Sequence, residues 1–261
     1  MARIELLYHL RLLAPVHIGT GMGFAKMVDD LTARAGPARG GGARLPYIPG
    51  SAVKGKVRSR CEALAQTLEL RVCTAPTARP EQETRGERRC KRRLCVICGL
   101  FGSPYAAGPL HFSDALLTKE WQRAGTRLGR DLGTGREMTD PFALTAVRTG
   151  NQIERATHTV EPDFLFSLEH TADDLQFEGS IVGQITPRPI NGLNLTLPLE
   201  GWLFVVGLQA VDKVGGLRSR GWGRCRIVVT SLKVDGTELA ADLSGLLAQE
   251  DYLLGVAEYE A

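Results

Sequence analysis

The chain has 261 residues, of which 43% are hydrophobic and 23% charged, a composition typical of an ordinary soluble globular protein of one or two domains. The net charge of +3 is modest, so any nucleic-acid-binding surface must come from local clusters of basic residues. No apolar run approaches the roughly 18 residues that span a bilayer, and the first residues lack a signal-peptide pattern, which argues against a membrane protein and predicts a cytoplasmic one. Six cysteines in such a protein more often bind metal than form disulfides.

A half-buried strand is predicted over residues 1–14. Apolar residues occupy every second position from Ile4 to Leu12, which is the period of a strand with one buried face. A glycine turn follows, and His17 precedes it between two apolar residues. A histidine in this setting is more often structural, and a general base is the alternative.

A polar, glycine-rich passage over residues 22–44 contains the acidic pair Asp29 and Asp30. Two adjacent carboxylates in a loop can hold a divalent metal such as Mg²⁺ or position a nucleophile. Paired acids are also common in ordinary turns, so the spacing alone leaves both interpretations open.

A helix is predicted to begin at Ser51, a suitable N-cap after the turn formed by Pro49 and Gly50. Five residues share its inward face: Val53, Val57, Cys61, Leu64 and Leu68. Four basic residues lie on its opposite flank: Lys54, Lys56, Arg58 and Arg60. Because the N–H groups at a helix N-terminus already attract anions, basic residues there indicate an anionic partner, with a solvated charged face as the alternative.

Residues 71–98 are basic, contain proline and lack periodicity, which predicts an insertion stabilised by something other than a core. Three of its cysteines follow the spacing Cys-x4-Cys-x2-Cys: Cys90, Cys95 and Cys98. Thiolates so spaced can surround Zn²⁺ tetrahedrally, with Cys73 as the fourth ligand and Cys61 or His111 as alternatives to it. The basic residues between these cysteines predict a surface that faces RNA or a partner protein.

A long, charged and turn-rich region over about residues 118–178 is predicted to carry a projecting hairpin, with strands near 145–148 and 163–169. Arg148, Arg155 and apolar residues at its tip could wedge between bases, whereas Phe166 is expected to pack within the hairpin.

Further along the chain, the patterns predict strands over 177–190 and 225–234 and favour a helix over the apolar run 199–214. The elements then follow the order strand, helix, strand, strand, helix, strand. This is the α+β, ferredoxin-like arrangement that RNA-recognition modules also use.

The loop over residues 214–224 contains four glycines and three arginines. Glycine lets a backbone approach a ligand closely, and arginines with exposed N–H groups supply positive charge, so the loop suits phosphate. The alternative is a turn between core elements with solvated arginines.

Four segments in this order resemble the successive signatures of the RAMP superfamily of CRISPR proteins: residues 15–21 (PVHIGTG), 47–58 (YIPGSAVKGKVR), 99–102 (GLFG) and 215–224 (GGLRSRGWGR). Within that superfamily, the cysteines before residues 99–102 and the pattern of Arg148, Asn151, Ile153 and Arg155 are most similar to backbone subunits of type III effector complexes. The resemblance implies one domain over residues 1–261. It would comprise a ferredoxin-like (RRM-like) palm, a zinc-binding insertion at 71–98 and a thumb insertion at about 118–178.

The same resemblance implies a partner set and an activity. Such subunits stack head to tail with other effector subunits, including further RAMP proteins, along a guide CRISPR RNA. They kink the duplex with target RNA and cleave the target at regular intervals in a metal-dependent reaction. The implied catalytic acid is Asp30 or its neighbour Asp29, with Asp30 favoured; a non-catalytic scaffold and a guide-precursor-processing endoribonuclease are the alternatives.

Together with the basic segments, the resemblance predicts a set of RNA-binding residues. They are Ser51, Lys54, Lys56, Arg58, Arg148, Arg155, Gly215, Gly216, Arg218, Ser219 and Arg220.

Overall fold

The computed structural model describes residues 1–23, 28–35, 44–70, 72–73, 90, 94–128, 144–187, 197–240 and 245–246. Its strands are β1 (Ala2–Leu12), β2 (Arg34–Ala35), β3 (Leu45–Pro46), β4 (Leu110–Phe112), β5 (Leu116–Leu117), β6 (Thr145–Ile153), β7 (Val160–Thr171), β8 (Gln176–Ile185), β9 (Cys225–Val234) and β10 (Thr237–Glu238). Its helices are α1 (Gly50–Thr67), α2 (Val96–Phe101), α3 (Lys119–Leu128) and α4 (Leu199–Gln209), with a 3-10 turn, η2, at Arg218–Arg220.

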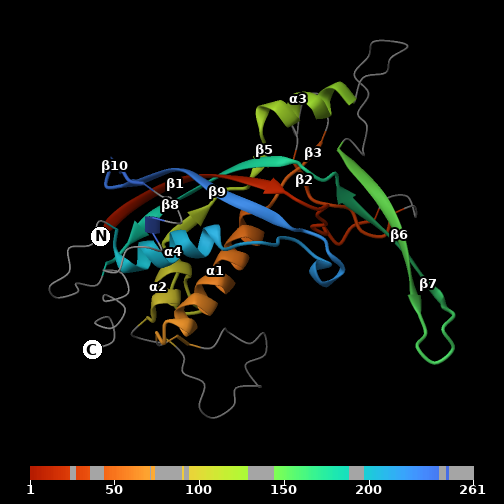
Figure 1. Ribbon diagram of the computed structural model, residues 1–261, viewed down its shortest axis with the longest axis horizontal. Helices are drawn as coiled ribbons and strands as arrows, with labels where there is room; N and C mark the ends of the chain where they lie inside the picture. The colour runs from red at the N-terminus through yellow and green to blue at the C-terminus, as the bar shows by residue number, and fades with distance from the viewer. Residues whose placement is uncertain are drawn as a thin grey trace.

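A six-stranded antiparallel sheet forms the centre of the molecule. Its strand order is β10-β9-β1-β8-β4, and β5 also pairs with β8. Helices α1, α2 and α4 lie together on one side of the sheet (Figure 1). The chain passes through β1, α1, β4, β8, α4 and β9 in turn, so the predicted order of strand, helix, strand, strand, helix, strand is present and the mixed α and β class is confirmed.

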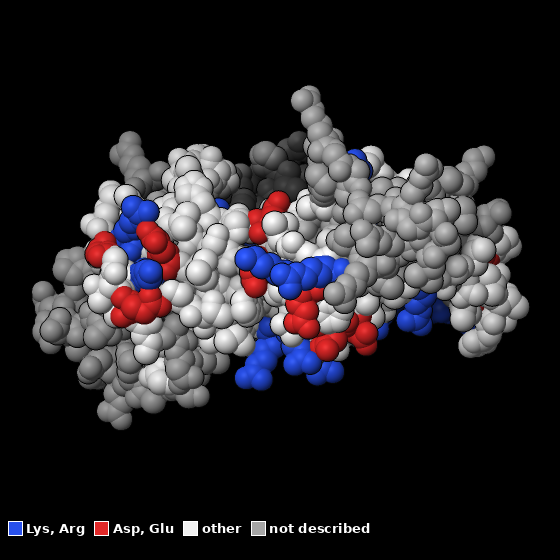
Figure 2. Space-filling view, turned by 90° about the horizontal axis from the view of Figure 1, so that it is seen from above, with Lys and Arg blue, Asp and Glu red and all other residues white. Residues whose placement is uncertain are grey.

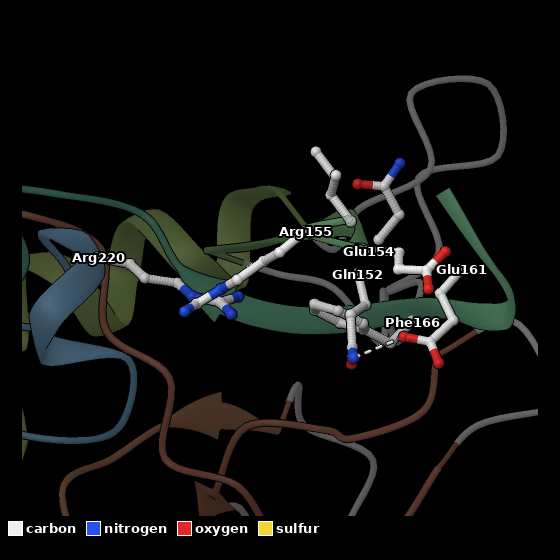
Figure 3. Close-up of a pocket in the computed structure, with 8 residues that line it drawn as sticks. Gln152, Glu154, Arg155, Glu161, Phe166 and Arg220 are labelled. Atoms are coloured by element: carbon white, nitrogen blue, oxygen red, sulfur yellow. Dashed lines mark hydrogen bonds between the residues drawn. The ribbon is translucent and has the colours of Figure 1, made fainter. Parts of the chain in front are cut away.

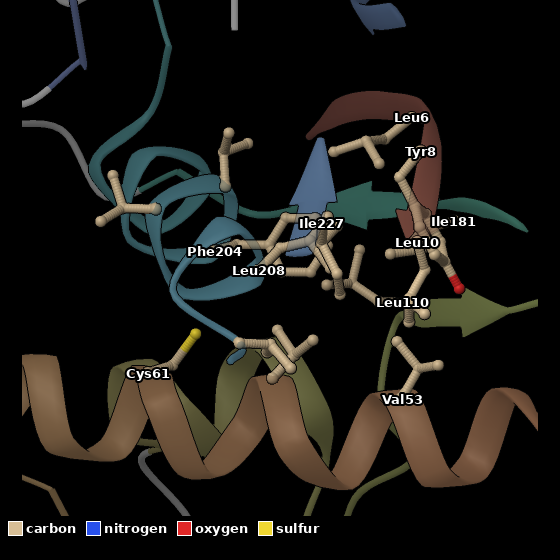
Figure 4. Packing of buried hydrophobic residues seen from close by; sticks show 14 of the residues in the cluster. Leu6, Tyr8, Leu10, Val53, Cys61, Leu110, Ile181, Phe204, Leu208 and Ile227 are labelled. Carbon is tan, nitrogen blue, oxygen red and sulfur yellow. The ribbon is translucent and has the colours of Figure 1, made fainter. Parts of the chain in front are cut away.

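The core lies between this sheet and the helices. Alternate residues of β1 are buried, and Leu6, Tyr8 and Leu10 point from the sheet into the cluster that includes side chains of α1 and α4 (Figure 4). A Cβ at Gly207 of α4 would lie 2.3 Å from the Sγ of Cys61 on α1. Glycine at that position therefore allows the two helices to pack closely.

The opposite face of the sheet carries paired charges. Exposed side chains of β1 form ion pairs with acidic neighbours: Arg3 with Glu5, His9 with Glu178, and Arg11 with Asp174. Viewed from above, basic and acidic side chains are intermixed on the molecule (Figure 2). On this face β1 therefore presents mixed charge, and its exposed positions carry none of the Phe, Tyr or Trp side chains on which RNA-recognition sheets stack bases.

The predicted hairpin is formed by β6 and β7, which pair in an antiparallel ladder and project away from the sheet (Figure 1). Within the predicted loop region, however, residues 119–128 form α3, whose Trp121 packs against the core. The sequence predicts turns in this segment because charged residues dominate it, whereas the inward contact of the helix is made by Trp121. Within the described ranges, no helix is both long enough and apolar enough to cross a membrane.

Two predicted helix ends were wrong. Helix α1 has Pro49, not Ser51, at its N-cap, and the Gly50 N–H donates to Asp114 Oδ1 at 2.8 Å, so a distant carboxylate satisfies the helix end. Helix α4 ends at Gln209 rather than at residue 214, because Lys213 then pairs with Arg224 in an antiparallel bridge.

Candidate nucleic-acid interface

The basic residues of α1 divide between two sides of the helix. Lys54 Nζ donates to the Leu110 carbonyl at 3.4 Å, and Arg58 donates to the Gly102 carbonyl and to Glu62. Lys56 and Arg60 instead face the chain segment that follows α4. Positions two residues apart in a helix point in nearly opposite directions, so the four predicted residues cannot contact one strand together.

Lys56 and Arg60 line a hollow of about 280 Å³. Its other lining residues come from the same helix and from the far end of the chain: Ser59, Val211, Asp212, Lys213, Arg218 and Ser219. Partial burial, followed by repulsion from Arg218 and Arg60, lowers the pKa of Lys56. Arg60 pairs with Asp212, and this bond contributes to lowering the pKa of that carboxyl against the opposing effect of burial. Four cations thus gather around one hollow, together with the Asp212 carboxylate that pairs with Arg60.

A second hollow, of about 310 Å³, lies where the hairpin meets the glycine-arginine loop, and it is lined by Arg148, Phe166, Arg220 and Trp222 among others. The guanidinium carbon of Arg220 lies 6.0 Å from the Phe166 ring centre, and that of Arg148 lies 6.0 Å from the Trp222 ring centre. Aromatic faces next to arginines are typical of surfaces that hold unstacked bases.

The second hollow continues along the hairpin into one of about 510 Å³ that shares Asn151, Phe166 and Arg220 with it. Here Arg155 and Arg220 extend toward each other from the two sides (Figure 3). Gln152 Nε2 donates to Glu161 Oε2 at 2.7 Å on the outer side. We call these two hollows along the hairpin, of about 310 and 510 Å³, the thumb groove.

The η2 turn connects the two surfaces. Arg218 and Ser219 line the hollow beside α1, whereas Arg220 lines the thumb groove. Leu217 precedes the turn with a left-handed φ of 52°. Consecutive residues of one tight turn therefore place positive charge on a path from α1 to the hairpin.

The two leading glycines of the loop have a different role from the predicted one. The Gly216 N–H donates to the His17 carbonyl at 2.8 Å, so this N–H is used within the protein. Gly215 has a φ of 75°, and a Cβ there would lie 2.6 Å from the same carbonyl oxygen. In this structure Gly215 allows the loop to pack closely against His17, whereas a Cβ at Gly216 would meet the same carbonyl oxygen at an ordinary 3.7 Å; Arg218 and Arg220 line the hollows.

Asp30 is bound on both of its carboxylate oxygens. Its Oδ1 accepts from the N–H groups of Thr20 and Gly21 at 3.0 and 2.9 Å, and its Oδ2 lies 3.2 Å from His17 Nε2. A Cβ at Gly19 would lie only 2.1 Å from Oδ2. The carboxylate thus fixes the turn that precedes it.

Asp29 is the exposed member of the pair. Its N–H donates to the Ser167 carbonyl at 2.8 Å, and the Ser167 N–H donates to its Oδ2 at 2.5 Å. These bonds hold Asp29 beside β7, at the base of the hairpin. Its second carboxylate oxygen has no hydrogen bond to any residue that the structure describes.

His17 is buried and bonded at both ring nitrogens. Its Nδ1 lies 2.6 Å from the Glu169 carbonyl, and its Nε2 faces Asp30. The Glu169 carbonyl can only accept a hydrogen bond, so Nδ1 donates to it. This favours the structural interpretation of His17 over a general base.

Sequence reasoning missed a buried carboxylate next to the acidic pair. Glu169 has no exposed side-chain surface and forms an ion pair with Arg34. The two residues are 135 positions apart, so no local pattern could have connected them. A charged residue in an otherwise strand-like segment was the available signal.

The four predicted cysteines come together. Their Sγ atoms all lie within 4.8 Å of one another, with 3.2 Å between Cys73 and Cys98 and 3.8 Å between Cys73 and Cys95. Ligands about 2.3 Å from a tetrahedral Zn²⁺ would be about 3.8 Å apart, so the group fits this ion. Burial raises the pKa of the Cys73 and Cys98 thiols, a cost that a bound cation would offset.

The alternative fourth ligands lie elsewhere. Cys61 is in the core, where its Sγ donates to the Leu203 carbonyl, and His111 is exposed on β4. The basic residues predicted to face RNA between the cysteines, at 88–89 and 91–93, lie outside the described residues.

Comparisons with known proteins find a matching family, a similar sequence and a similar structure. The family description "RAMP superfamily" matches residues 9–226. A relative from Enterococcus italicus, named CRISPR system Cms endoribonuclease Csm3, is 26% identical over 239 residues, which cover 88% of this chain and 92% of that protein. A chain in the cryo-EM structure of Type III-B Cmr-beta in the apo state has a TM-score of 0.52 at 13% identity, and the match covers 87% of this chain and 97% of that chain. The last similarity shows a shared fold.

Proposed function

Because this chain belongs to the RAMP superfamily, we propose that it is a backbone subunit of a type III CRISPR effector complex. In this proposal the sheet, α1 and α4 form a ferredoxin-like palm, residues 71–98 a zinc-binding insertion, and the region around β6 and β7 the thumb. The chain would bind guide CRISPR RNA and complementary target RNA in the cytoplasm, next to further RAMP subunits stacked head to tail. The relative named as an endoribonuclease supports a cleavage role.

The observation that carries the proposal is the path of positive charge through η2. Phosphates repeat along RNA, and a protein that follows the backbone needs spaced cations rather than base-specific contacts. Arg218 and Ser219 meet Lys56 in one hollow, and Arg220 continues into the thumb groove. Sequence specificity would then come from base pairing between guide and target.

The geometry favours Asp29 over Asp30 as the catalytic acid. Asp30 is bound by two N–H groups and faces His17, which leaves little capacity for a substrate or an ion. Asp29 is exposed beside the hairpin, and within the described part of the chain only one of its carboxylate oxygens, the one bound by Ser167, accepts a hydrogen bond. Asp30 is better assigned to shaping the loop.

The residues around Asp29 fit a metal held largely by substrate. Mg²⁺ is commonly bound through one or two carboxylates plus phosphate oxygens, and Asp29 could supply one such carboxylate. When bound, the ion would stabilise charge on the reacting phosphate. The protein's own part would be to hold the strand in the thumb groove, with a splayed nucleotide whose 2′-hydroxyl lies in line with the phosphate.

An assembled complex with guide and target RNA provides the test. Asp29→Ala should reduce the cleavage rate by about 10² or more while target binding is retained, as expected for loss of a group needed for proton transfer or charge stabilisation. Asp29→Asn should behave similarly because it keeps the bond from Ser167 but not the charge. Unchanged cleavage in both variants would contradict the catalytic role of Asp29. It would favour a non-catalytic scaffold subunit in which Asp29 and Asp30 have no part in cleavage.

Guide-precursor processing is a weaker alternative. Such processing often uses a histidine, and His17, the histidine next to the acidic loop, is buried with both ring nitrogens facing acceptors. Guide ends of normal length in cells that lack this protein would dismiss it.

A further inference from the structure

We infer that Glu169 is a positioning residue that joins the acidic loop to the thumb hairpin, so that Asp29 and the hairpin keep one relative position. The inference rests on the proposed function for its catalytic consequence. The contacts on which it is based lie within this chain and do not depend on the proposed function.

Glu169 lies on β7 and uses every polar atom that it has. Its Oε1 accepts from the Thr145 hydroxyl at 2.6 Å and from Arg34, and its Oε2 accepts from the Thr32 N–H at 3.0 Å. Its own N–H donates to the Asp30 carbonyl at 3.1 Å, and its carbonyl accepts from His17. One residue thus contacts the loop on both sides of Asp30 and the neighbouring hairpin strand.

The burial of this group makes the connection rigid. The Glu169 side chain has 0% exposed surface and Arg34 has 10%. A buried ion pair is costly to break, because removing one partner leaves the other charge unpaired in a poorly solvated site. Opening the loop from the hairpin would expose this pair and break two further hydrogen bonds of Glu169, one from the Thr32 N–H and one to the Asp30 carbonyl.

The acidic loop also runs directly along β7. Asp29 exchanges two hydrogen bonds with Ser167, and Asp30 forms a parallel bridge with Leu168. Glu169 is the next residue along the strand and binds Thr32 and Arg34 further along the loop. The loop therefore behaves as an additional short strand of the hairpin.

His17 connects this network to the glycine-arginine loop, along which RNA binds in the proposed function. The His17 ring links Glu169 to Asp30, and its carbonyl accepts from Gly216, two residues before Arg218. The hairpin, the acid and the glycine-arginine loop are thus joined at one point. A target strand seated against the hairpin would meet Asp29 at a distance fixed by these bonds.

The test compares Glu169→Gln with Glu178→Gln in the assembled complex with guide RNA. Glu178 lies on β8 at the exposed sheet face, where its carboxylate is 3.6 Å from His9 Nε2, away from the thumb groove and the acidic loop. With saturating target, Glu169→Gln should slow cleavage at least about tenfold and change target affinity less than about threefold, since small misplacement of a reacting group is costly. Glu178→Gln should leave the cleavage rate as in the unaltered protein.

Thr145→Val provides a milder variant in case Glu169→Gln does not fold. It removes the hydroxyl that donates to Oε1 and accepts from Arg34, with little change of shape, and a smaller loss of cleavage in the same direction is expected. A purely structural role would instead lower binding and cleavage together, and that result would overturn the inference.

Hydrogen exchange separates this inference from the proposed function. Glu169→Gln should speed amide exchange over residues 28–34 at least about threefold while exchange in β1 stays unchanged, because only the local connection is lost. If the unaltered complex does not cleave RNA, the proposed function fails while this measurement still tests the connection. Unchanged exchange over 28–34 would refute the connection even in an active complex.

Discussion

At the scale of single residues, Lys56 tests most directly the proposal that the hollow beside α1 binds an anion. Burial and the nearby cations Arg218 and Arg60 lower its pKa, so the protein alone disfavours the charge on Lys56. A phosphate in the hollow would reverse this preference and raise the pKa again. RNA binding should therefore be coupled to proton uptake at alkaline pH.

The sign of the pH dependence follows from this coupling. RNA affinity should be highest where Lys56 is protonated in the free protein, and it should fall as the pH rises through the lowered pKa of Lys56. Lys56→Arg should remove most of this alkaline loss, because a guanidinium stays charged. Titration of a fluorescent guide RNA at several pH values would measure the effect. Lys233→Arg, on β9 beside Glu238, is the control and should keep the original profile.

The sequence predicted which basic and acidic residues belong to the candidate site better than it predicted where their side chains point. The basic character of α1 was evident from the sequence, but Lys54 and Arg58 turn toward carbonyl groups near β4 and α2, and Lys56 turns toward η2. The acidic pair was also evident, whereas the roles of its members depend on Ser167 and His17. Such partners are far away in the chain, and only the fold brings them together.

At the scale of elements, the clearest prediction came from uninterrupted periodicity. Strand β1 alternates between buried and exposed residues along its whole length. The predicted bounds of β9 match the structure, although its alternation shifts by one residue at an irregularity in its pairing with β1. Helix α3 was missed because its pattern is dominated by charge, and its inward contact is Trp121. Helix α2 was not predicted because it is short and includes Cys98 of the cysteine cluster.

The start of α2 makes the cysteine cluster part of the core. Cys95 is the N-cap of α2, and its Sγ accepts from the Cys98 N–H at 3.5 Å. The helix then buries Val96, Ile97 and Leu100. Loss of the metal should therefore affect packing beyond the insertion.

Cys95→Ser should remove the metal and lower the stability of the protein. We expect about one Zn²⁺ per chain in the unaltered protein and close to none in the variant, with a melting temperature lower by at least about 3 °C, or about 1 kcal/mol. Elemental analysis and thermal unfolding would measure both. Cys225→Ser is the matched control: Cys225 is buried in β9, away from the cluster, so that variant should lose stability but keep its zinc. Full zinc content in Cys95→Ser would contradict the four-cysteine site.

At the scale of the whole molecule, positive charge is distributed unevenly. The net charge is only +3, and the exposed sheet face neutralises its cations in pairs such as Arg11 with Asp174. The hollow beside α1 and the thumb groove instead gather cations from segments that are far apart in the sequence. RNA should therefore bind along one path and leave the sheet face uncovered.

The salt dependence of RNA binding tests this distribution. Each phosphate contact with a single strand contributes about 0.7 to the slope of log affinity against log salt concentration. Arg218→Gln should thus lower the magnitude of the slope by about 0.7 and weaken binding similarly for all guide sequences, because backbone contacts carry no sequence information. Arg11→Gln removes the same charge from the sheet face, so it should leave both slope and affinity unchanged. Equal effects of the two substitutions would show that RNA responds to the net charge of the molecule rather than to the path through η2.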